Sequence, residues 1–319
     1  MTTNALDELI DVRLTCIRYA ARDTHIFELQ KVDGSFLPEA EPGAHIDIHL
    51  PNNLIRQYSL LHAGPALTAY SIGVKRDPSS RGGSVFMHDH LRVGCRLKIS
   101  KPRNHFALRL DGGESVLIAG GIGITPLYCM ANRLAELNKP WRLFYAARSR
   151  ADAAFLEELA LHENVMFHFD DEQVGKILDI EAVIHNAPIS SHFYCCGPIA
   201  MIKAFEAAAK DVPLQRVHVE YFTAASSPAL EGGFVVELAR SKMEFSIPNG
   251  KTILEVIMAA GVQVPHSCES GVCGSCETRI IEGQADHRDS ILDERERSEG
   301  QTMMICCSGS KSTRLVLDL

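Results

Sequence analysis

The sequence predicts a multi-domain protein, with an antiparallel β-barrel, then an α/β domain with a parallel sheet, then a small C-terminal α+β module. At 319 residues, and with roughly 150 residues per domain, the chain has room for two or three domains. Its pattern changes from short strands to alternating strands and helices near Gly113, and changes again after a small, polar segment containing glycine and proline. We therefore expect domains at residues 1–111, 112–223 and 234–319, with a linker at 224–233.

The first segment is predicted to be a barrel of short strands. Apolar and polar residues alternate with period two in Ala44–Leu50 and Tyr70–Lys75. Further apolar runs occur at Ile26–Leu29, Leu97–Ile99 and Phe106–Leu110. Only Val85–Leu91 resembles a helix, and many short strands with few helices favour an antiparallel barrel.

The second segment alternates strands with helices, which is typical of a doubly wound parallel sheet. Strands are expected at Val116–Ala119, Leu143–Ala147, Val165–Phe169, Phe193–Cys196 and Val217–Phe222. Helices are expected at Leu127–Leu137, Ala153–Leu161 and Ile199–Ala209.

The third segment is predicted to begin with a hairpin formed by Phe234–Leu238 and Glu244–Ile247. A helix follows, because Thr252 and Glu255 have the spacing of a capping box and Gly261 stands where a helix ends.

Composition and charge exclude several classes of function. The net charge of −8 provides no basic surface for nucleic acid. The uncharged, apolar stretch Val116–Ala131 is interrupted by glycines and a proline and is shorter than the about 20 residues of a membrane span. The first residues lack the basic and apolar regions of a signal peptide. We therefore expect a cytoplasmic protein that binds neither nucleic acid nor membrane.

The cysteines crowd near the C-terminus in a metal-binding pattern. Cys268, Cys273 and Cys276 form C-x4-C-x2-C, and either Cys306 or Cys307 supplies a fourth thiol about 30 positions later. This is the ligand spacing of a plant-type [2Fe–2S] cluster. A zinc site fits less well, because structural zinc sites usually use two C-x2-C pairs or histidines. If the chain is extended at this point, only one of the two neighbouring cysteines faces the cluster.

Two loops in the α/β segment are candidates for nicotinamide binding. Gly120–Pro126 (Gly-Gly-Ile-Gly-Ile-Thr-Pro) lies between a strand and a helix, where glycines allow a pyrophosphate to approach the backbone; a simple tight turn is the alternative. Cys196-Gly197-Pro198 also lies between a strand and a helix. Both loops are expected at the carboxyl edge of the sheet, where ligands bind in such folds.

The nucleotide preference stays open at the level of residues. No acid ends the second strand of this segment, although Asp170 at the end of the third strand could replace it in binding the ribose. Arg148 and Arg150 could instead accept the 2′-phosphate of NADPH.

A second motif lies in the barrel, at Arg56-Gln57-Tyr58-Ser59. Arginine offers a bidentate contact to phosphate, tyrosine a flat face for a ring system, and serine a hydroxyl. Arg81-Gly82-Gly83-Ser84, before a helix, forms a possible anion nest. Taken alone, these residues fit an ordinary barrel strand, with an exposed arginine and a core tyrosine, better than a binding site.

Together, these motifs resemble the phthalate dioxygenase reductase family, which includes vanillate demethylase reductases. The similarity extends over nearly the whole chain, in the order flavin barrel, nicotinamide domain and C-terminal β-grasp ferredoxin domain. His287-Arg288-Asp289 and Ser308 also match the family. One departure is Cys307-Ser308-Gly309, where many members have Val-Ser-Arg.

The resemblance implies site residues and cofactors, namely FMN, NADH and a [2Fe–2S] cluster. It implies that Cys268, Cys273, Cys276 and Cys306 bind the cluster, and that Ser59, Thr125 and Cys196 lie at the reacting rings. Cofactor binding is expected from Arg56, Gln57, Tyr58, Ser59, Lys75, Gly82, Gly83, Ser84, Gly121, Gly123, Thr125, Arg148, Asp170, Cys196, Gly197, Pro198 and Phe222. Phe222 resembles the aromatic residue that covers the flavin in this family, with a core phenylalanine as the alternative.

The expected function is that of an NADH-dependent reductase component, which passes electrons through FMN and the cluster to a terminal oxygenase of the Rieske non-haem iron type. The oxygenase would be an aromatic dioxygenase or demethylase. One alternative is a general NAD(P)H flavin and iron–sulfur reductase that serves another acceptor. A second is a non-enzymatic zinc or redox-sensing protein.

Overall fold

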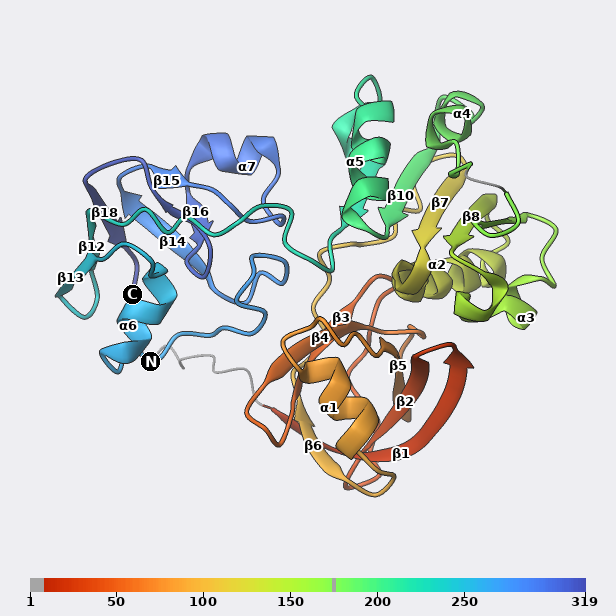
Figure 1. Ribbon diagram of the computed structural model, residues 1–319, viewed down its shortest axis with the longest axis horizontal. Helices are drawn as coiled ribbons and strands as arrows, with labels where there is room; N and C mark the ends of the chain where they lie inside the picture. The colour runs from red at the N-terminus through yellow and green to blue at the C-terminus, as the bar shows by residue number, and fades with distance from the viewer. Residues whose placement is uncertain (1–8, 174–175) are drawn as a thin grey trace. The chain divides into compact units, whose positions relative to one another are not determined.

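The computed structural model describes residues 9–173 and 176–319 (Figure 1). The chain divides into two compact units, residues 1–220 and residues 221–319. The first unit contains a six-stranded antiparallel sheet and a five-stranded parallel sheet, and the second contains a five-stranded mixed sheet.

The N-terminal sheet of the first unit forms a barrel, as predicted. Its strands are β1 (Ile10–Ala21), β2 (Thr24–Lys31), β3 (His45–His49), β4 (Ile55–Ser59), β5 (Ala69–Lys75) and β6 (Arg96–Ile99), in the order β4-β3-β6-β1-β2-β5. The two edge strands meet where Leu60 bridges Ile72, just beyond the end of β4. Helix α1 (Gly83–His90) follows the barrel strand β5. The interior is filled by the alternate apolar residues of the strands.

The parallel sheet of the first unit has the order β11-β10-β7-β8-β9. Its elements are β7 (Ser115–Gly120), η1 (Gly121–Gly123), α2 (Ile124–Glu136), β8 (Trp141–Ala147), η2 (Arg150–Asp152), α3 (Leu156–Leu159), β9 (Val165–Phe169), α4 (Ile180–His185), β10 (His192–Cys196), α5 (Ile199–Ala208), η3 (Leu214–Arg216) and β11 (Val217–Glu220). Figure 1 shows α2 beside β7 and β8, and α5 beside β10. The strand order reverses between β7 and β10, so their carboxyl ends form the crevice where ligands bind in open α/β sheets.

The second unit combines a mixed sheet with two short helices around its own core. Its elements are β12 (Phe234–Leu238), β13 (Met243–Ile247), α6 (Ile253–Ala259), β14 (Glu277–Glu282), β15 (Ala285–Asp286), α7 (Glu294–Glu299), β16 (Thr302–Met304), β17 (Gly309–Ser310) and β18 (Arg314–Leu317). The predicted hairpin is confirmed as β12 and β13, and Thr252 and Glu255 form the predicted capping box at the start of α6. Gly261 has a φ of 87° just beyond this helix, which favours glycine.

Three predicted elements were wrong. Phe106–Leu110 is not a strand, because Phe106 and Leu108 pack against the core of the parallel sheet instead of pairing. The helix predicted over 153–161 shrinks to Leu156–Leu159, since Phe155 has a left-handed φ of 59°. β11 ends at Glu220 rather than at Phe222. The longest strand of the barrel, β1, was not predicted at all.

None of the helices among the described residues has both the length and the hydrophobicity needed to cross a membrane.

Candidate cofactor and electron-transfer site

The structure brings the predicted flavin-phosphate residues together. Arg56 on β4 donates from its guanidinium to the backbone oxygen of Arg81 at 3.1 Å, so it reaches the loop before α1. A Cβ atom on Gly83 would lie 2.6 Å from the Arg56 Cγ atom, so only glycine lets the arginine stem pass. Gly82, with a φ of 86°, forms the N-cap of α1. These residues enclose the corner where a phosphate would meet both the guanidinium and the first backbone N–H groups of the helix.

The other residues predicted to bind the flavin occupy different places around this corner. The Ser84 hydroxyl accepts a hydrogen bond from the backbone N–H of Asp77, and Lys75 lies nearby at the end of β5. Tyr58 packs against the barrel core. The Gln57 side chain donates to Asp47 across the β3–β4 pair at 2.9 Å, so it lies on the opposite face of the strand from Tyr58.

Three chemically active side chains meet between the barrel and the parallel sheet. Ser59 ends β4 and is buried, and its hydroxyl donates to the carboxylate of Glu220 at 3.4 Å. Glu220 ends β11 directly beside Cys196, the last residue of β10. Burial raises the pKa of Glu220 to about 8, which keeps this carboxyl largely protonated at neutral pH. Burial also raises the pKa of the Cys196 thiol well above its ordinary value, so the sulfur is not a thiolate.

The two loops predicted to bind the nicotinamide lie in contact at the carboxyl edge. A Cβ atom on Gly123 would lie 2.2 Å from the Cys196 carbonyl oxygen, and Gly197 similarly approaches the Gly120 backbone. Thr125 lies in the first turn of α2 and is buried, and its hydroxyl donates to the Ile122 carbonyl at 3.0 Å. The Cγ2 atom of Thr125 would lie 2.7 Å from a Cβ atom on Gly73 of the barrel strand β5. The crevice at the switch point of the sheet therefore adjoins the barrel.

The residues predicted to bind the adenosine part of the nicotinamide cofactor lie farther along the same carboxyl edge of the sheet. Arg148 follows β8 and is exposed. Asp170 follows β9 and is also exposed, and its backbone N–H donates to Ala147 at 3.1 Å. Adjacent parallel strands thus place both residues at the carboxyl edge of the sheet.

The four predicted cluster ligands converge in the second unit. All four thiols are buried, and hydrogen bonds link Cys268 with Cys273 and Cys276 with Cys306. Cys268 also interacts with Cys306. Among the described residues, no three His, Cys, Asp or Glu side chains gather around one single-ion position. Four buried thiols that contact one another supply the four cysteine ligands that a two-iron cluster needs.

Backbone donors surround the first ligand of this site. The N–H groups of Ser270 and Val272 point to the Cys268 sulfur at 3.3 and 3.5 Å. Such N–H···S hydrogen bonds stabilise charge on a cluster and adjust its potential. The residues present therefore fit a [2Fe–2S] group.

The condition of an extended chain at Cys306-Cys307 is not met, because residues 305–307 form a turn. The Cys307 thiol nevertheless lies apart from the thiols of the four cluster ligands. It points toward the Met304 carbonyl at 3.7 Å and lies 2.5 Å from the position of a Cβ atom on Gly271. Turn geometry and packing, rather than strand alternation, separate the two neighbouring cysteines.

Phe222 belongs to the second unit, where it is 41% exposed, and its predicted role over the flavin stays a prediction. Glu220 was not predicted from the sequence. The available signal was an acid near the end of a strand, but only the pairing with Cys196 and the contact with Ser59 identify it as part of the site.

Comparison with known proteins agrees with this arrangement. Residues 117–207 match the oxidoreductase NAD-binding domain, and residues 236–310 match the 2Fe-2S iron-sulfur cluster binding domain. The chain is 50% identical to the phenoxybenzoate dioxygenase subunit beta of Ectopseudomonas oleovorans, over 97% of both chains. It is 42% identical to a vanillate O-demethylase oxidoreductase of Pseudomonas sp., over 98% of this chain and 100% of the relative. The solved structure of phthalate dioxygenase reductase superposes with a TM-score of 0.74 at 39% identity, covering 98% of each chain.

The fold, the nicotinamide crevice and the four-thiol site define a modular oxidoreductase with an NAD-binding domain and a [2Fe–2S] domain. More narrowly, the chain belongs to the phthalate dioxygenase reductase and vanillate O-demethylase reductase family. This membership confirms the predicted family, the multi-domain fold, and an NADH-dependent electron-transfer protein with flavin and iron–sulfur cofactors.

Proposed function

We propose that this protein is the reductase component of a Rieske-type non-haem iron oxygenase system, passing electrons from NADH through FMN and the [2Fe–2S] cluster to an oxygenase that acts on an aromatic compound. The observation on which this rests is the combination, in one chain, of the Ser59–Glu220–Cys196 crevice with the buried four-thiol site. Full-length relatives named as dioxygenase and demethylase components support the choice of acceptor.

Binding of the flavin is assigned to the barrel. Arg56 and the backbone of Gly82 and Gly83 hold its single phosphate, and Tyr58 offers a ring face. FMN fits this arrangement because the barrel has one phosphate corner and no second adenine-binding motif is evident in the sequence.

When bound, NADH supplies two electrons as a hydride, FMN divides them into single electrons, and the cluster accepts one electron at a time. The chain's own residues position these groups. The Ser59 hydroxyl donates to Glu220 Oε2, and the raised pKa of the half-buried Glu220 keeps its carboxyl neutral beside Ser59 and Cys196. Cys196 and Thr125, as neutral groups, line the nicotinamide side of the crevice.

At the other end of the path, Cys268, Cys273, Cys276 and Cys306 hold the cluster, and the N–H groups of the loop stabilise its negative charge. We also propose that the domains span residues 1–111, 112–223 and 234–319, with a linker at 224–233. The proposed partner is a cognate terminal oxygenase, as the family membership supports. We also propose a cytoplasmic location and no binding to nucleic acid, the latter supported by the net charge of −8.

Reconstitution with purified oxygenases tests the function. The holoprotein, NADH and a phenoxybenzoate- or vanillate-type oxygenase should together yield oxygenated product, and omission of any one should abolish it. Efficient reduction of quinones or other free acceptors, with no support of any oxygenase, would favour the general reductase instead. Acid extraction identifies the flavin, and recovery of stoichiometric FAD would refute FMN. Arg56→Ala should lose the flavin but keep the iron–sulfur spectrum, since the cluster ligands lie in the other unit.

A further inference from the structure

An acidic segment follows β9 at the end of the crevice where the adenine ribose would lie. Asp170, Asp171 and Glu172 are consecutive, and the backbone N–H groups of Asp170 and Asp171 donate to Ala147 and Arg148, each at 3.1 Å. These two bonds fix the acidic segment against the segment that follows β8. Both segments continue from the carboxyl ends of adjacent strands.

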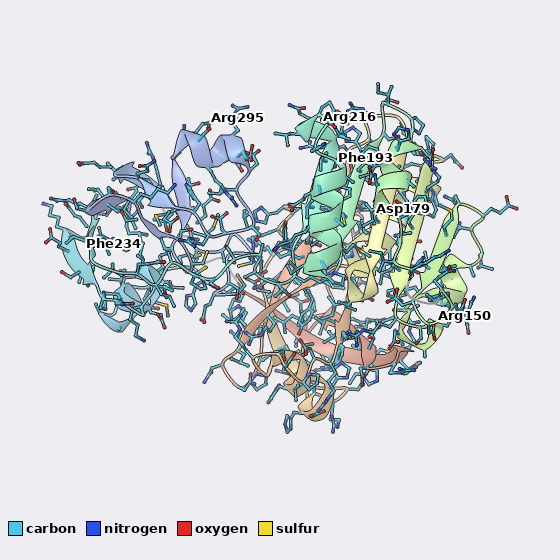
Figure 2. The ribbon with its side chains drawn as sticks, turned by 45° about the horizontal axis from the view of Figure 1, so that its top comes forward. Arg150, Asp179, Phe193, Arg216, Phe234 and Arg295 are labelled. Carbon is cyan, nitrogen blue, oxygen red and sulfur yellow. The ribbon has the colours of Figure 1, made fainter. Side chains whose placement is uncertain are left out.

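Arg150 is held by this acidic segment. Its Nε atom donates to Glu172 Oε1 at 2.6 Å, and a terminal nitrogen donates to Oε2 at 3.2 Å. The guanidinium also lies over the ring of the buried Phe169, 4.6 Å from its centroid. A bidentate partner and a stacking face together orient this planar cation. Figure 2 shows Arg150 at the opposite end of the parallel sheet from Arg216, which precedes β11.

The other charged residues at this edge of the sheet disfavour the 2′-phosphate that distinguishes NADPH from NADH. Among the described residues, no carboxylate pairs with Arg148, whereas Asp170 and Asp171 add two negative charges beside it. Arg22 pairs with Asp152 at 3.7 Å and adds no free cation. A 2′-phosphate would therefore meet one unpaired arginine and two carboxylates, whereas a ribose hydroxyl can donate to a carboxylate.

We propose that Glu172 determines the preference for NADH over NADPH, because its bidentate ion pair occupies the Arg150 guanidinium and so withholds this cation from a 2′-phosphate. This inference rests on the proposed nicotinamide-dependent function and assigns its specificity to one residue. Removal of the Glu172 charge releases Arg150 to act with Arg148, and two guanidinium groups form a typical 2′-phosphate site.

The test compares variants of the full-length holoprotein. Glu172→Gln should raise kcat/KM for NADPH about tenfold in ferricyanide reduction and leave the value for NADH within about twofold. Calorimetric titration with 2′,5′-ADP, which requires no turnover, should show a similar gain in affinity. The matched control Glu163→Gln removes one charge at an exposed residue before β9, at the other end of that strand, and should change neither quantity.

The double variant Arg150→Gln/Glu172→Gln identifies the responsible cation. It should return NADPH use and 2′,5′-ADP affinity to those of the unaltered protein. The inference is overturned if Glu172→Gln leaves both quantities unchanged, or if the double variant keeps the gain, since general charge removal would then explain it. Should the unaltered protein oxidise neither nucleotide, the proposed function fails, and the 2′,5′-ADP titrations still decide the role of Glu172.

Discussion

Glu220 offers the most direct test of the crevice between the barrel and the parallel sheet. Burial raises its pKa to about 8, and the hydrogen bond from Ser59 only partly opposes that increase. With this pKa, the protonated fraction falls from about nine tenths at about pH 7 to about one tenth at about pH 9. If the protonated carboxyl is the active form, transfer of electrons from NADH to the flavin should slow about tenfold over that interval.

Anaerobic stopped-flow measurement of flavin bleaching by excess NADH is the appropriate assay, because it excludes transfer to oxygen and to an external acceptor. Glu220→Gln, which stays neutral, should be fast at both pH values. The control Glu163→Gln changes an exposed carboxylate and should keep the slope of the unaltered protein. A flat profile in the unaltered protein, or an undiminished slope in Glu220→Gln, would refute the reasoning.

The same group makes a prediction about stability. Because its pKa is raised above the ordinary value of 4.5, the folded protein binds more protons between about pH 4.5 and about pH 8. The contribution to stability is thus fully present below the lower value and is lost as the pH rises to the upper one. Glu220→Gln should therefore be more stable than the unaltered protein at about pH 9, by at most about 5 kcal/mol. Urea unfolding followed by flavin release measures this difference.

Three further predictions concern other parts of the chain. Cys306→Ser should lose the cluster spectrum and electron transfer to cytochrome c but keep ferricyanide reduction. Cys307→Ser should retain its iron, because the Cys307 thiol lies against Gly271 and not among the ligands. If iron analysis shows the reverse, the two assignments must be exchanged. Gly123→Ala should lower kcat/KM for NADH about a hundredfold while the flavin is retained. The new Cβ atom would lie 2.2 Å from the Cys196 carbonyl and displace the loop by about 1 Å. A near-normal kcat/KM would show that the loop relaxes without cost. His218 stacks on Tyr194 and hydrogen-bonds to His192 at 3.0 Å, and burial lowers its pKa to about 4. Its contribution to stability is therefore present above about pH 6.5 and lost as the pH falls toward about 4, so His218→Gln should reduce the acid sensitivity of urea unfolding; equal sensitivity in both proteins would contradict this.

Local chemistry made much of the site predictable. The C-x4-C-x2-C spacing identifies a cluster loop because ligands on one loop must have a defined separation along the chain. The Gly120–Pro126 loop and the capping box at Thr252 were also recognisable, since glycine conformation and helix ends depend on near neighbours. Phe106–Leu110 illustrates the limit of such patterns. Its alternation satisfies packing against a neighbouring core rather than pairing in a sheet.

By itself, the sequence determined the order of the domains, the strand–loop–helix setting of the phosphate loops and the set of cysteines from which the ligands come, because these depend on residues close together in the chain. Only the tertiary structure decided which distant residues meet. Ser59 and Glu220 are separated by 161 positions, yet they hydrogen-bond because the barrel packs at the carboxyl edge of the sheet. Glu172 reaches Arg150 because β8 and β9 are adjacent, and Cys307 turns from the ligands because the chain bends at residues 305–307. Strand order, register and turn geometry arise from packing across the whole unit, and no local pattern specifies them.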